Sequence, residues 1–226
     1  MTQTIKAAAF DAYGTLFDVY SVGALAETMF PGHGAQLAEI WRVAQIDYTR
    51  LRTLSDRYRD FEAITGDALN FAADTLGLDL GGGRSGQLME QYSRLEAFAE
   101  NRDVLEGLKA GGLTLVVLSN GTPAMLDSAI EAAGFGGLFA HALSADTVRK
   151  FKTAPEVYRL GPEALGCPAS EIVFVSSNGW DACGAAWFGY RSFWVNRAGR
   201  PLERLGVRPE GEGRSLTDLP EFIAGL

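Results

Sequence analysis

Hydrophobic residues change their spacing after the first 17 residues of the chain. Residues 5–17, I-K-A-A-A-F-D-A-Y-G-T-L-F, form a mostly apolar run that leads into Asp11, and Gly14 and Thr15 then turn the chain. Such a run is typical of a short buried strand. Ligands bind outside the carboxyl ends of the strands in open parallel sheets. Asp11 is therefore either an active-site carboxylate or, in the simpler interpretation, the cap of the turn that follows.

Between residues 18 and 98 there is no convincing strand pattern, and the apolar spacing becomes helical. Residues 36–55 repeat apolar side chains at intervals of three and four, which is typical of an amphipathic helix. Residues 59–76 and 85–98 show the same pattern. We therefore expect an all-helical domain inserted after the first strand. The apolar face of the first predicted helix is formed by Leu37, Ile40, Trp41, Ala44, Tyr48 and Leu51.

From about residue 104 onward, strand-like and helix-like segments alternate. This alternation predicts an α/β protein with a Rossmann-like, doubly wound parallel sheet. The core domain would then comprise residues 1–17 and 99–226, and the helical cap residues 18–98. We expect residues 197–214 to be a surface connection before a last short helix. The predicted strands are 113–118, 172–175 and 192–195, with a weaker one at 139–143, and the helix best defined by the pattern is 154–165.

Polar side chains follow three of the predicted strands. They are Asp11, then Ser119 and Asn120, then the run at 176–181, while Lys152 stands just before a predicted helix. Right-handed crossovers bring such strand ends to one edge of a parallel sheet. Hydroxyl groups and amides at that edge suit anion binding, helped by helix N-termini.

One glycine pattern is misleading. Gly81, Gly83 and Gly86 spell G-x-G-x-x-G, which binds dinucleotides only where it follows a strand and opens a helix. Here it lies inside the helical insertion, so we expect a loop between two helices. The sequence also lacks a G-x-S-x-G elbow, which leaves a serine-hydrolase triad without support.

Composition narrows the partners. The formal net charge is −8, which argues against nucleic-acid binding because that needs a basic face. A few local cations can still make a pocket for a small anion. No apolar run is long enough to span a membrane, and no signal-type segment is found, so we expect a cytoplasmic protein without a membrane partner. Cys167 and Cys183 are expected to be reduced, structural thiols.

These residues resemble the haloacid dehalogenase superfamily and, within it, the L-2-haloacid dehalogenases. The resemblance covers nearly the whole chain. It implies the haloacid dehalogenase fold, hydrolysis of a small 2-haloacid through an aspartyl ester with inversion at C2, no cofactor or metal, and a homodimer. The matching motifs are D-A-Y-G-T-L at 11–16, W-R-x-x-Q at 41–45, S-N-G at 119–121, Lys152, and S-S-N-G-W-D at 176–181.

The chemistry separates this branch from the magnesium-dependent phosphatases of the same superfamily, which are the main alternative. Those relatives carry a second aspartate two positions after the nucleophile, where this chain has Tyr13. They also have a Gly-Asp pair where this chain has Ser176 and Ser177. Mg²⁺ prefers carboxylate oxygen, so two ligands are missing. A halide leaves as a stable anion and needs no acid, unlike an alkoxide. A catalytically silent binding protein is the second alternative, and the intact motif set argues against it.

The resemblance also implies a role for each site residue. Asp11 attacks C2, and Thr15 orients it. Arg42 and Asn120 stabilise the departing halide. Ser119 and Lys152 hold the substrate carboxylate, and Lys152 favours the charged form of its neighbouring carboxylate. The water that hydrolyses the ester is positioned by Asp181, Ser176 and Asn178, and the pocket walls are formed by Tyr13, Phe61, Tyr158 and Trp180.

Several of these residues also have simpler interpretations. Arg42 could pair with Glu39 or Asp47 on its own helix. Tyr158 and Trp180 could be core aromatics. The family's proline after the motif lysine is Thr153 here, from which we expect only a local difference in the loop.

Overall fold

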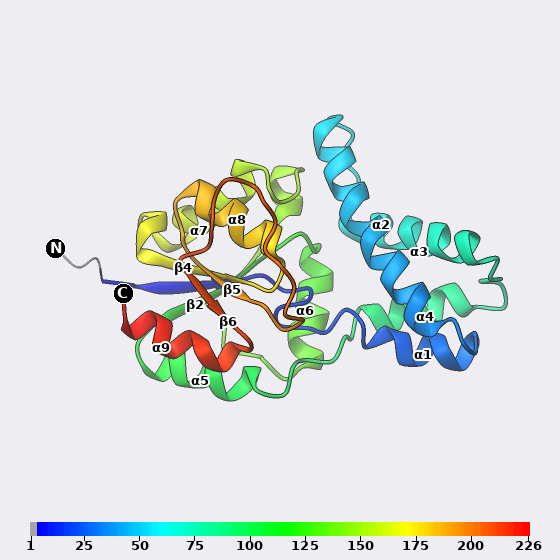
Figure 1. The fold of residues 1–226 in the computed structure, drawn as a ribbon, viewed down its shortest axis with the longest axis horizontal. Helices are drawn as coiled ribbons and strands as arrows, with labels where there is room; N and C mark the ends of the chain where they lie inside the picture. Colours follow the sequence, from blue (N-terminus) through cyan, green and yellow to red (C-terminus); the bar gives the residue numbers. More distant parts are fainter. Residues whose placement is uncertain (1–3) are drawn as a thin grey trace.

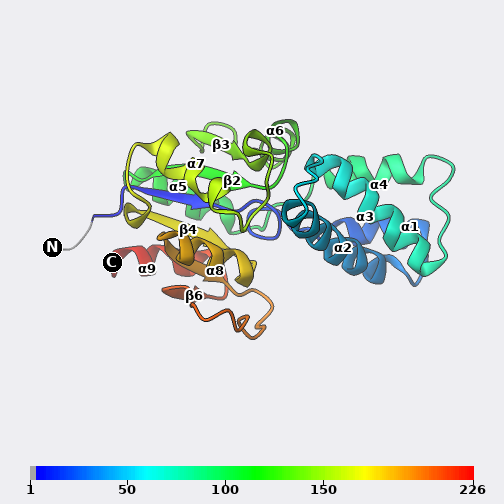
Figure 2. The ribbon, with the colours of Figure 1, turned by 90° about the horizontal axis from the view of Figure 1, so that it is seen from above.

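The computed structural model describes residues 4–226, and the first three residues of the predicted core domain lie outside this range. The chain forms an α/β core and a separate group of helices at one end of it (Figures 1 and 2). The core sheet contains six parallel strands in the order β3-β2-β1-β4-β5-β6. Their bounds are Ala7–Phe10 (β1), Thr114–Ser119 (β2), His141–Ser144 (β3), Ile172–Ser176 (β4), Arg191–Val195 (β5) and Gly211–Gly213 (β6).

The central strand β1 explains why this sheet is doubly wound. Its neighbours are β2 and β4, with Phe10 level with Val117 on one side and Val175 on the other. Successive strands lead away from β1 in opposite directions, so the order reverses between β1 and β4. Such a reversal leaves a crevice at the carboxyl ends of the strands, which is the usual ligand site of open α/β sheets. The residues after β1 and β4 therefore meet at this crevice.

Helices cover both faces of the sheet. In Figure 1, α5 (Asn101–Ala110) and α9 (Leu219–Ala224) lie on one side, and α7 (Pro155–Leu165) and α8 (Gly179–Phe188) lie on the other. The remaining core helix is α6 (Pro123–Ala132). Every residue of β1 and β4 is buried, as expected for parallel strands covered on both faces.

The cap consists of four helices inserted between β1 and α5. They are α1 (Val22–Met29), α2 (Gly34–Leu54), α3 (Phe61–Leu76) and α4 (Arg84–Tyr92). They lie beyond the carboxyl end of β1, next to the crevice (Figure 2). The side chain of Asp60 caps α3 by accepting a hydrogen bond from the Ala63 N–H, and Gly77 ends the helix with φ of 67°.

The structure corrects three details of the sequence prediction. Residues 197–214 were expected to be a surface connection, yet β6 lies within them and extends the sheet. Leu51 was expected on the apolar face of α2 and is 59% exposed, because the last turns of α2 extend past the body of the cap. The helix predicted at 85–98 ends at Tyr92, and the chain then returns to the core.

Two of the cap predictions are confirmed. The residues between α3 and α4 form a turn that contains Gly81 and ends at Gly83, which caps α4. This is the interhelical loop expected for the glycine pattern, although Gly86 lies within α4. Among the described residues, no helix is long and apolar enough to cross a membrane.

Asn101, the first residue of α5, connects the core to the turn after β1. It is fully buried, and its Nδ2 donates to the carbonyl oxygens of Thr15 and Leu16 at 3.2 and 3.0 Å. Asn101→Ala should lower the free energy of unfolding by about 1–3 kcal/mol, because two buried acceptors lose their donor. Urea unfolding measures this loss. The exposed neighbour Asp103 provides the control: Asp103→Ala should change stability by less than about 0.5 kcal/mol. Equal losses in the two variants would contradict the assignment.

Candidate active site

Asp11 lies directly after β1, in the crevice where the strand order reverses. Its N–H donates to Val175 O at 2.9 Å, which continues the ladder between β1 and β4 by one residue. Gly14 then adopts φ of 94°, a conformation that favours glycine, and this turns the chain beneath the carboxylate. The Asp11 side chain is only 8% exposed. A carboxylate in such a position needs partners for its charge.

Four side chains donate hydrogen bonds to the Asp11 carboxylate. Its Oδ2 accepts from Asn178 Nδ2 at 2.9 Å, Thr15 Oγ1 at 3.0 Å and Ser176 Oγ at 3.4 Å. Its Oδ1 accepts from Lys152 Nζ at 2.9 Å. The Thr15 hydroxyl is aimed at Asp11 because its oxygen already accepts a hydrogen bond from the Ser177 N–H at 2.8 Å. The two carboxylate oxygens therefore differ, since Oδ2 has three donors and Oδ1 has one.

Lys152 lies between two carboxylates. Its Nζ is 2.9 Å from Asp11 Oδ1 and 2.8 Å from Asp181 Oδ2, and its side chain is 1% exposed. Burial by itself lowers the pKa of Lys152, but the charges of Asp11 and Asp181 outweigh burial and raise the pKa above its ordinary value. The ammonium is therefore charged wherever the protein is folded at neutral pH. Its position is the one expected, so Thr153 in place of proline does not displace it from Asp11.

Asp181 is the more deeply buried of the two carboxylates. It is fully buried, and Tyr158 OH donates to its Oδ1 at 2.7 Å. Burial raises the pKa of Asp181 above its usual value, although the Lys152 charge opposes this effect. Burial also raises the pKa of Tyr158 well above its usual value, and the neighbouring charge of Asp181 adds to the effect. A carboxylate with a raised pKa is a stronger base than an exposed one.

Arg42 reaches the crevice from α2 of the cap. Its Nη2 donates to Tyr13 O at 3.1 Å and to Asn178 Oδ1 at 3.3 Å. Because Asn178 also donates to Asp11, one amide joins the carboxylate and the guanidinium. The pairing of Arg42 with Glu39 or Asp47 is not observed. Among the ion pairs of residues 4–226, none involves Arg42, and Asp47 instead lies 3.7 Å from Arg50.

An aromatic cluster fills the space between Asp11 and the cap. The Tyr13 ring lies 5.3 Å from that of Phe61 and stacks on Tyr92 at 5.7 Å, measured between ring centroids. The Tyr13 hydroxyl is buried and has no hydrogen-bond partner among the described residues. A Cβ on Gly121 would lie 3.1 Å from this hydroxyl, so Tyr13 closely approaches the loop that follows β2.

The other predicted residues lie around this centre with different degrees of access. Asn120 Oδ1 accepts from the Lys152 N–H at 2.9 Å, and Ser119 Oγ accepts from the Gly121 N–H at 3.2 Å. Both residues therefore shape the loop after β2. Tyr158 is buried beneath Asp181 and packs against core aromatics, so it does not form a pocket wall. Trp180 is half-buried and receives the Arg50 guanidinium at 5.0 Å from its ring centroid.

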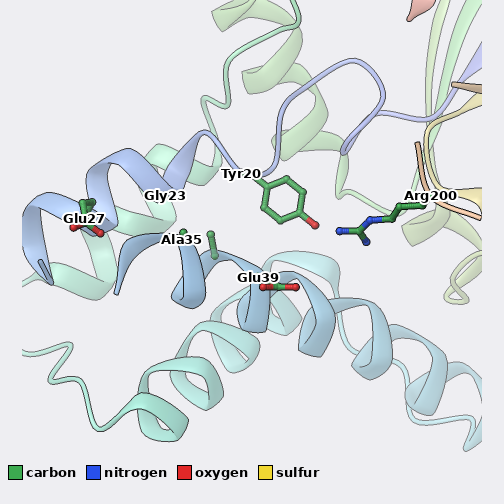
Figure 3. A pocket seen from close by; sticks show the side chains of 7 residues that line it. Tyr20, Gly23, Glu27, Ala35, Glu39 and Arg200 are labelled. Atoms are coloured by element: carbon green, nitrogen blue, oxygen red, sulfur yellow. The ribbon is translucent and has the colours of Figure 1, made fainter. Parts of the chain in front are cut away.

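A cleft of about 660 Å³ leads from the surface to this centre, between α2 and the loops of the core. Its lining includes Arg42, Val43, Ile46 and Arg50 from the cap and Asn178, Trp180 and Arg197 from the core. A neighbouring pocket of about 490 Å³ shares Tyr20 and Arg200 with it, and Glu39 lies below them (Figure 3). That second pocket contains none of the side chains that contact Asp11.

Sequence reasoning did not assign roles to Gln45, Thr65 and Tyr92, which surround the Arg42 side chain. Gln45 Oε1 accepts from Arg42 Nη1 at 2.8 Å and from Tyr92 OH at 3.0 Å. The only available signal was the spacing of W-R-x-x-Q, which sets Gln45 one turn after Arg42. Among the described residues, no group of three or more His, Cys, Asp or Glu side chains could hold a metal ion.

A family model described as haloacid dehalogenase-like hydrolase matches residues 5–189. Together with the sheet order and the carboxylate after β1, this match shows that the chain belongs to the haloacid dehalogenase-like hydrolases.

More similar relatives narrow the comparison. The chain is 45% identical to an (S)-2-haloacid dehalogenase of Pseudomonas sp. (strain YL), over 97% of this chain and 94% of that protein. It is 41% identical to haloacetate dehalogenase H-2 of Moraxella sp. (strain B), over 91% and 92%. Among solved structures, an L-2-haloacid dehalogenase matches with a TM-score of 0.96 and 52% identity, over 98% of this chain and 99% of that chain. The Xanthobacter autotrophicus enzyme with chloropropionic acid covalently bound matches with a TM-score of 0.93 and 34% identity, over 99% and 100%.

The raised pKa of Tyr158 predicts a pH dependence of stability. An unfolded chain loses a tyrosine proton above about pH 10, while folded Tyr158 keeps it, so stability falls as pH rises through this region. Tyr158→Phe removes this contribution. Its free energy of unfolding should fall less steeply than that of the wild type, by about 1.4 kcal/mol per pH unit. Urea unfolding at several alkaline pH values measures the slope. Tyr20→Phe, at a half-exposed residue, should keep the wild-type slope, and an unchanged slope in Tyr158→Phe would sink the prediction.

Proposed function

We propose that the protein is a hydrolytic dehalogenase that converts L-2-haloalkanoic acids, and haloacetates, to 2-hydroxy acids and halide through an ester on Asp11, with inversion at C2. The observation that carries this proposal is the arrangement of Asp11 and Arg42. A buried carboxylate and a guanidinium without a carboxylate partner are held by the same side chain, Asn178. A nucleophile and an anion acceptor on either side of a small substrate are what an in-line displacement of halide requires.

Asp11 attacks in the first step. One of its oxygens forms a bond to C2 while the bond from C2 to the halogen breaks, and the halide leaves with the bonding electrons. Oδ2 is held by three donors, whereas Oδ1 has only Lys152. Oδ1 is therefore the freer oxygen and the proposed nucleophile, because it keeps lone pairs that no donor occupies. Lys152 supports this step by stabilising the ionised carboxylate.

Arg42 stabilises the departing halide. The charge that develops on a leaving group is stabilised best by donors that are fixed in place before the reaction. Arg42 meets this condition, because neutral acceptors hold its guanidinium and none of them cancels its charge. Phe61 and Trp180 would border the same space and exclude water from it. Asn120 is proposed as a second halide contact through its amide nitrogen, since its oxygen is already bonded to the Lys152 N–H.

The substrate carboxylate is proposed to lie near the loop after β2. Ser119, Lys152 and backbone N–H groups after Asp11 would hold it. The buried Tyr13 hydroxyl, which has no partner among the described residues, faces the same loop and would add a donor. A buried hydroxyl without a partner is uncommon, so a role toward a bound anion explains it.

In the second step, water attacks the ester carbonyl carbon of Asp11. Asp181 is the proposed base, since burial raises its pKa and so strengthens its affinity for the proton of water. Ser176 and Asn178 would position that water, because both contact Asp11 Oδ2. The carbonyl carbon then releases the 2-hydroxy acid, and Asp11 returns to a carboxylate that contains one oxygen from water.

A magnesium-dependent phosphatase of the same family is not favoured. The position of its acid is Tyr13, which stacks within the aromatic cluster and has no carboxylate to offer. We therefore predict full halide release from L-2-chloropropionate in the presence of EDTA, and no phosphatase activity on p-nitrophenyl phosphate with added Mg²⁺. Halide release that EDTA abolishes and Mg²⁺ restores would contradict the proposal.

The covalent ester has its own test. A single turnover with excess enzyme in ¹⁸O-water should place the label in the Asp11 carboxylate and little in the first product, because water attacks the ester rather than C2. Mass spectrometry of the peptide that contains Asp11 measures the label. Asp11→Asn should lower halide release by at least about 10⁴-fold, as expected on removing a covalent nucleophile. Label that appears first in the product would instead indicate direct attack by water.

The homodimer and the cytoplasmic location expected from the sequence stay predictions. No partner subunit contributes to the proposed chemistry, because every side chain it uses belongs to one chain. Analytical ultracentrifugation would determine the oligomeric state.

A further inference from the structure

Gln45 is the buried neighbour of Arg42 on α2, and the chemistry proposed above does not use it. Its side chain is fully buried and makes three hydrogen bonds. The oxygen Oε1 accepts from Arg42 Nη1 at 2.8 Å and from Tyr92 OH at 3.0 Å. The nitrogen Nε2 donates to Thr65 Oγ1 at 2.7 Å. One amide thus links the guanidinium to α3 and α4 of the cap.

Thr65 fixes the orientation of this amide. A threonine hydroxyl has one hydrogen, and Thr65 donates it to Phe61 O at 2.6 Å. Toward Gln45 the Thr65 oxygen can therefore only accept, so the Gln45 nitrogen must face it. The Gln45 oxygen then faces Arg42, which can only donate. Phe61 and Thr65 are also held in place, since Trp41 Nε1 donates to Thr65 O at 2.8 Å.

The amide is a neutral acceptor, and its neutrality has a consequence for Arg42. Nη1 is bonded to Gln45, and Nη2 to Tyr13 O and Asn178 Oδ1, so every acceptor that contacts the guanidinium is uncharged. A carboxylate at position 45 would form a buried ion pair and neutralise much of the positive charge. A charge in a buried site interacts more strongly with an incoming anion than it would in water. The arrangement therefore fixes the guanidinium and preserves its charge.

We infer that Gln45 is a positioning residue that aims the Arg42 guanidinium at the leaving halide without neutralising it. Thr65 acts with Gln45 by fixing the amide. The inference rests on the proposed function, because it requires that Arg42 contacts the halide. It predicts that changes at these positions affect the reaction according to the halide, since chloride depends more than bromide on stabilisation as it leaves.

The test compares the single-turnover rates of chloride and bromide release from L-2-chloropropionate and L-2-bromopropionate. Gln45→Met should lower chloride release about tenfold and bromide release less, because the guanidinium loses its fixed direction. Gln45→Glu should lower chloride release about a hundredfold, because the carboxylate neutralises Arg42. The rate ratio of bromide to chloride should rise in both variants, and inhibition by added bromide should weaken. A purely structural role would lower both rates by the same factor.

Two further variants keep the test informative if a change at Gln45 prevents folding. Thr65→Val removes the acceptor that fixes the amide and should raise the rate ratio. Thr65→Ser keeps the hydroxyl and should retain the wild-type ratio. The matched control is Thr49→Val, because Thr49 is a buried polar residue on the same helix that does not contact Arg42. Thr49→Val should leave both rates at wild-type values relative to the amount of folded protein.

The outcomes separate this inference from the proposed function. If the wild type releases no halide from either substrate, or Arg42→Lys leaves the rate ratio unchanged, the proposed function or the halide role of Arg42 is wrong. If Arg42→Lys raises the ratio but Gln45→Met and Thr65→Val do not, the positioning role of Gln45 is wrong. A raised ratio in all three variants, with Thr65→Ser and Thr49→Val unchanged, supports the inference.

Discussion

The site depends on one buried ammonium between two buried carboxylates. Asp11 and Asp181 both lie within reach of Lys152 Nζ, at 2.9 and 2.8 Å. Two ionised carboxylates in one buried space repel each other, and each loses hydration that the protein must replace. Lys152 offsets both effects. It also sets a difference between the two groups, because Asp11 has further donors for its charge while Asp181 is more deeply buried.

The division of the chain into core and cap follows from this constraint. The core supplies every group that bonds to the Asp11 carboxylate, from the ends of β1 and β4 and the loop before α7. The cap supplies the Arg42 guanidinium and the aromatic walls. Asn178 is the direct link between the two sets. A rigid sheet thus holds the nucleophile, while the inserted helices determine what the nucleophile faces.

Much of the fold and of the site was readable from the sequence for a simple reason. Apolar spacing reports which side of an element is buried, and parallel strands bring their carboxyl ends to one edge. Asp11, Ser176 and Asn178 could therefore be placed together without a structure. The spacing could not reveal β6, because its three residues are Gly211, Glu212 and Gly213 and have no apolar face. It could not reveal that Leu51 is exposed, because helical spacing does not show where the neighbouring helices end.

The sequence by itself determined the fold class, the inserted cap and the position of the nucleophile, since these depend on local pattern and on the polar residues that end each strand. Only the tertiary structure decided the partners of each charge. Arg42 and Glu39 are neighbours on a helix in sequence, yet the fold turns Arg42 toward Asn178 and Gln45. Hydrogen bonds between distant elements depend on distances and directions that no periodicity encodes. For this reason the hydrogen bonds around Gln45 became visible only once α2, α3 and α4 were packed together.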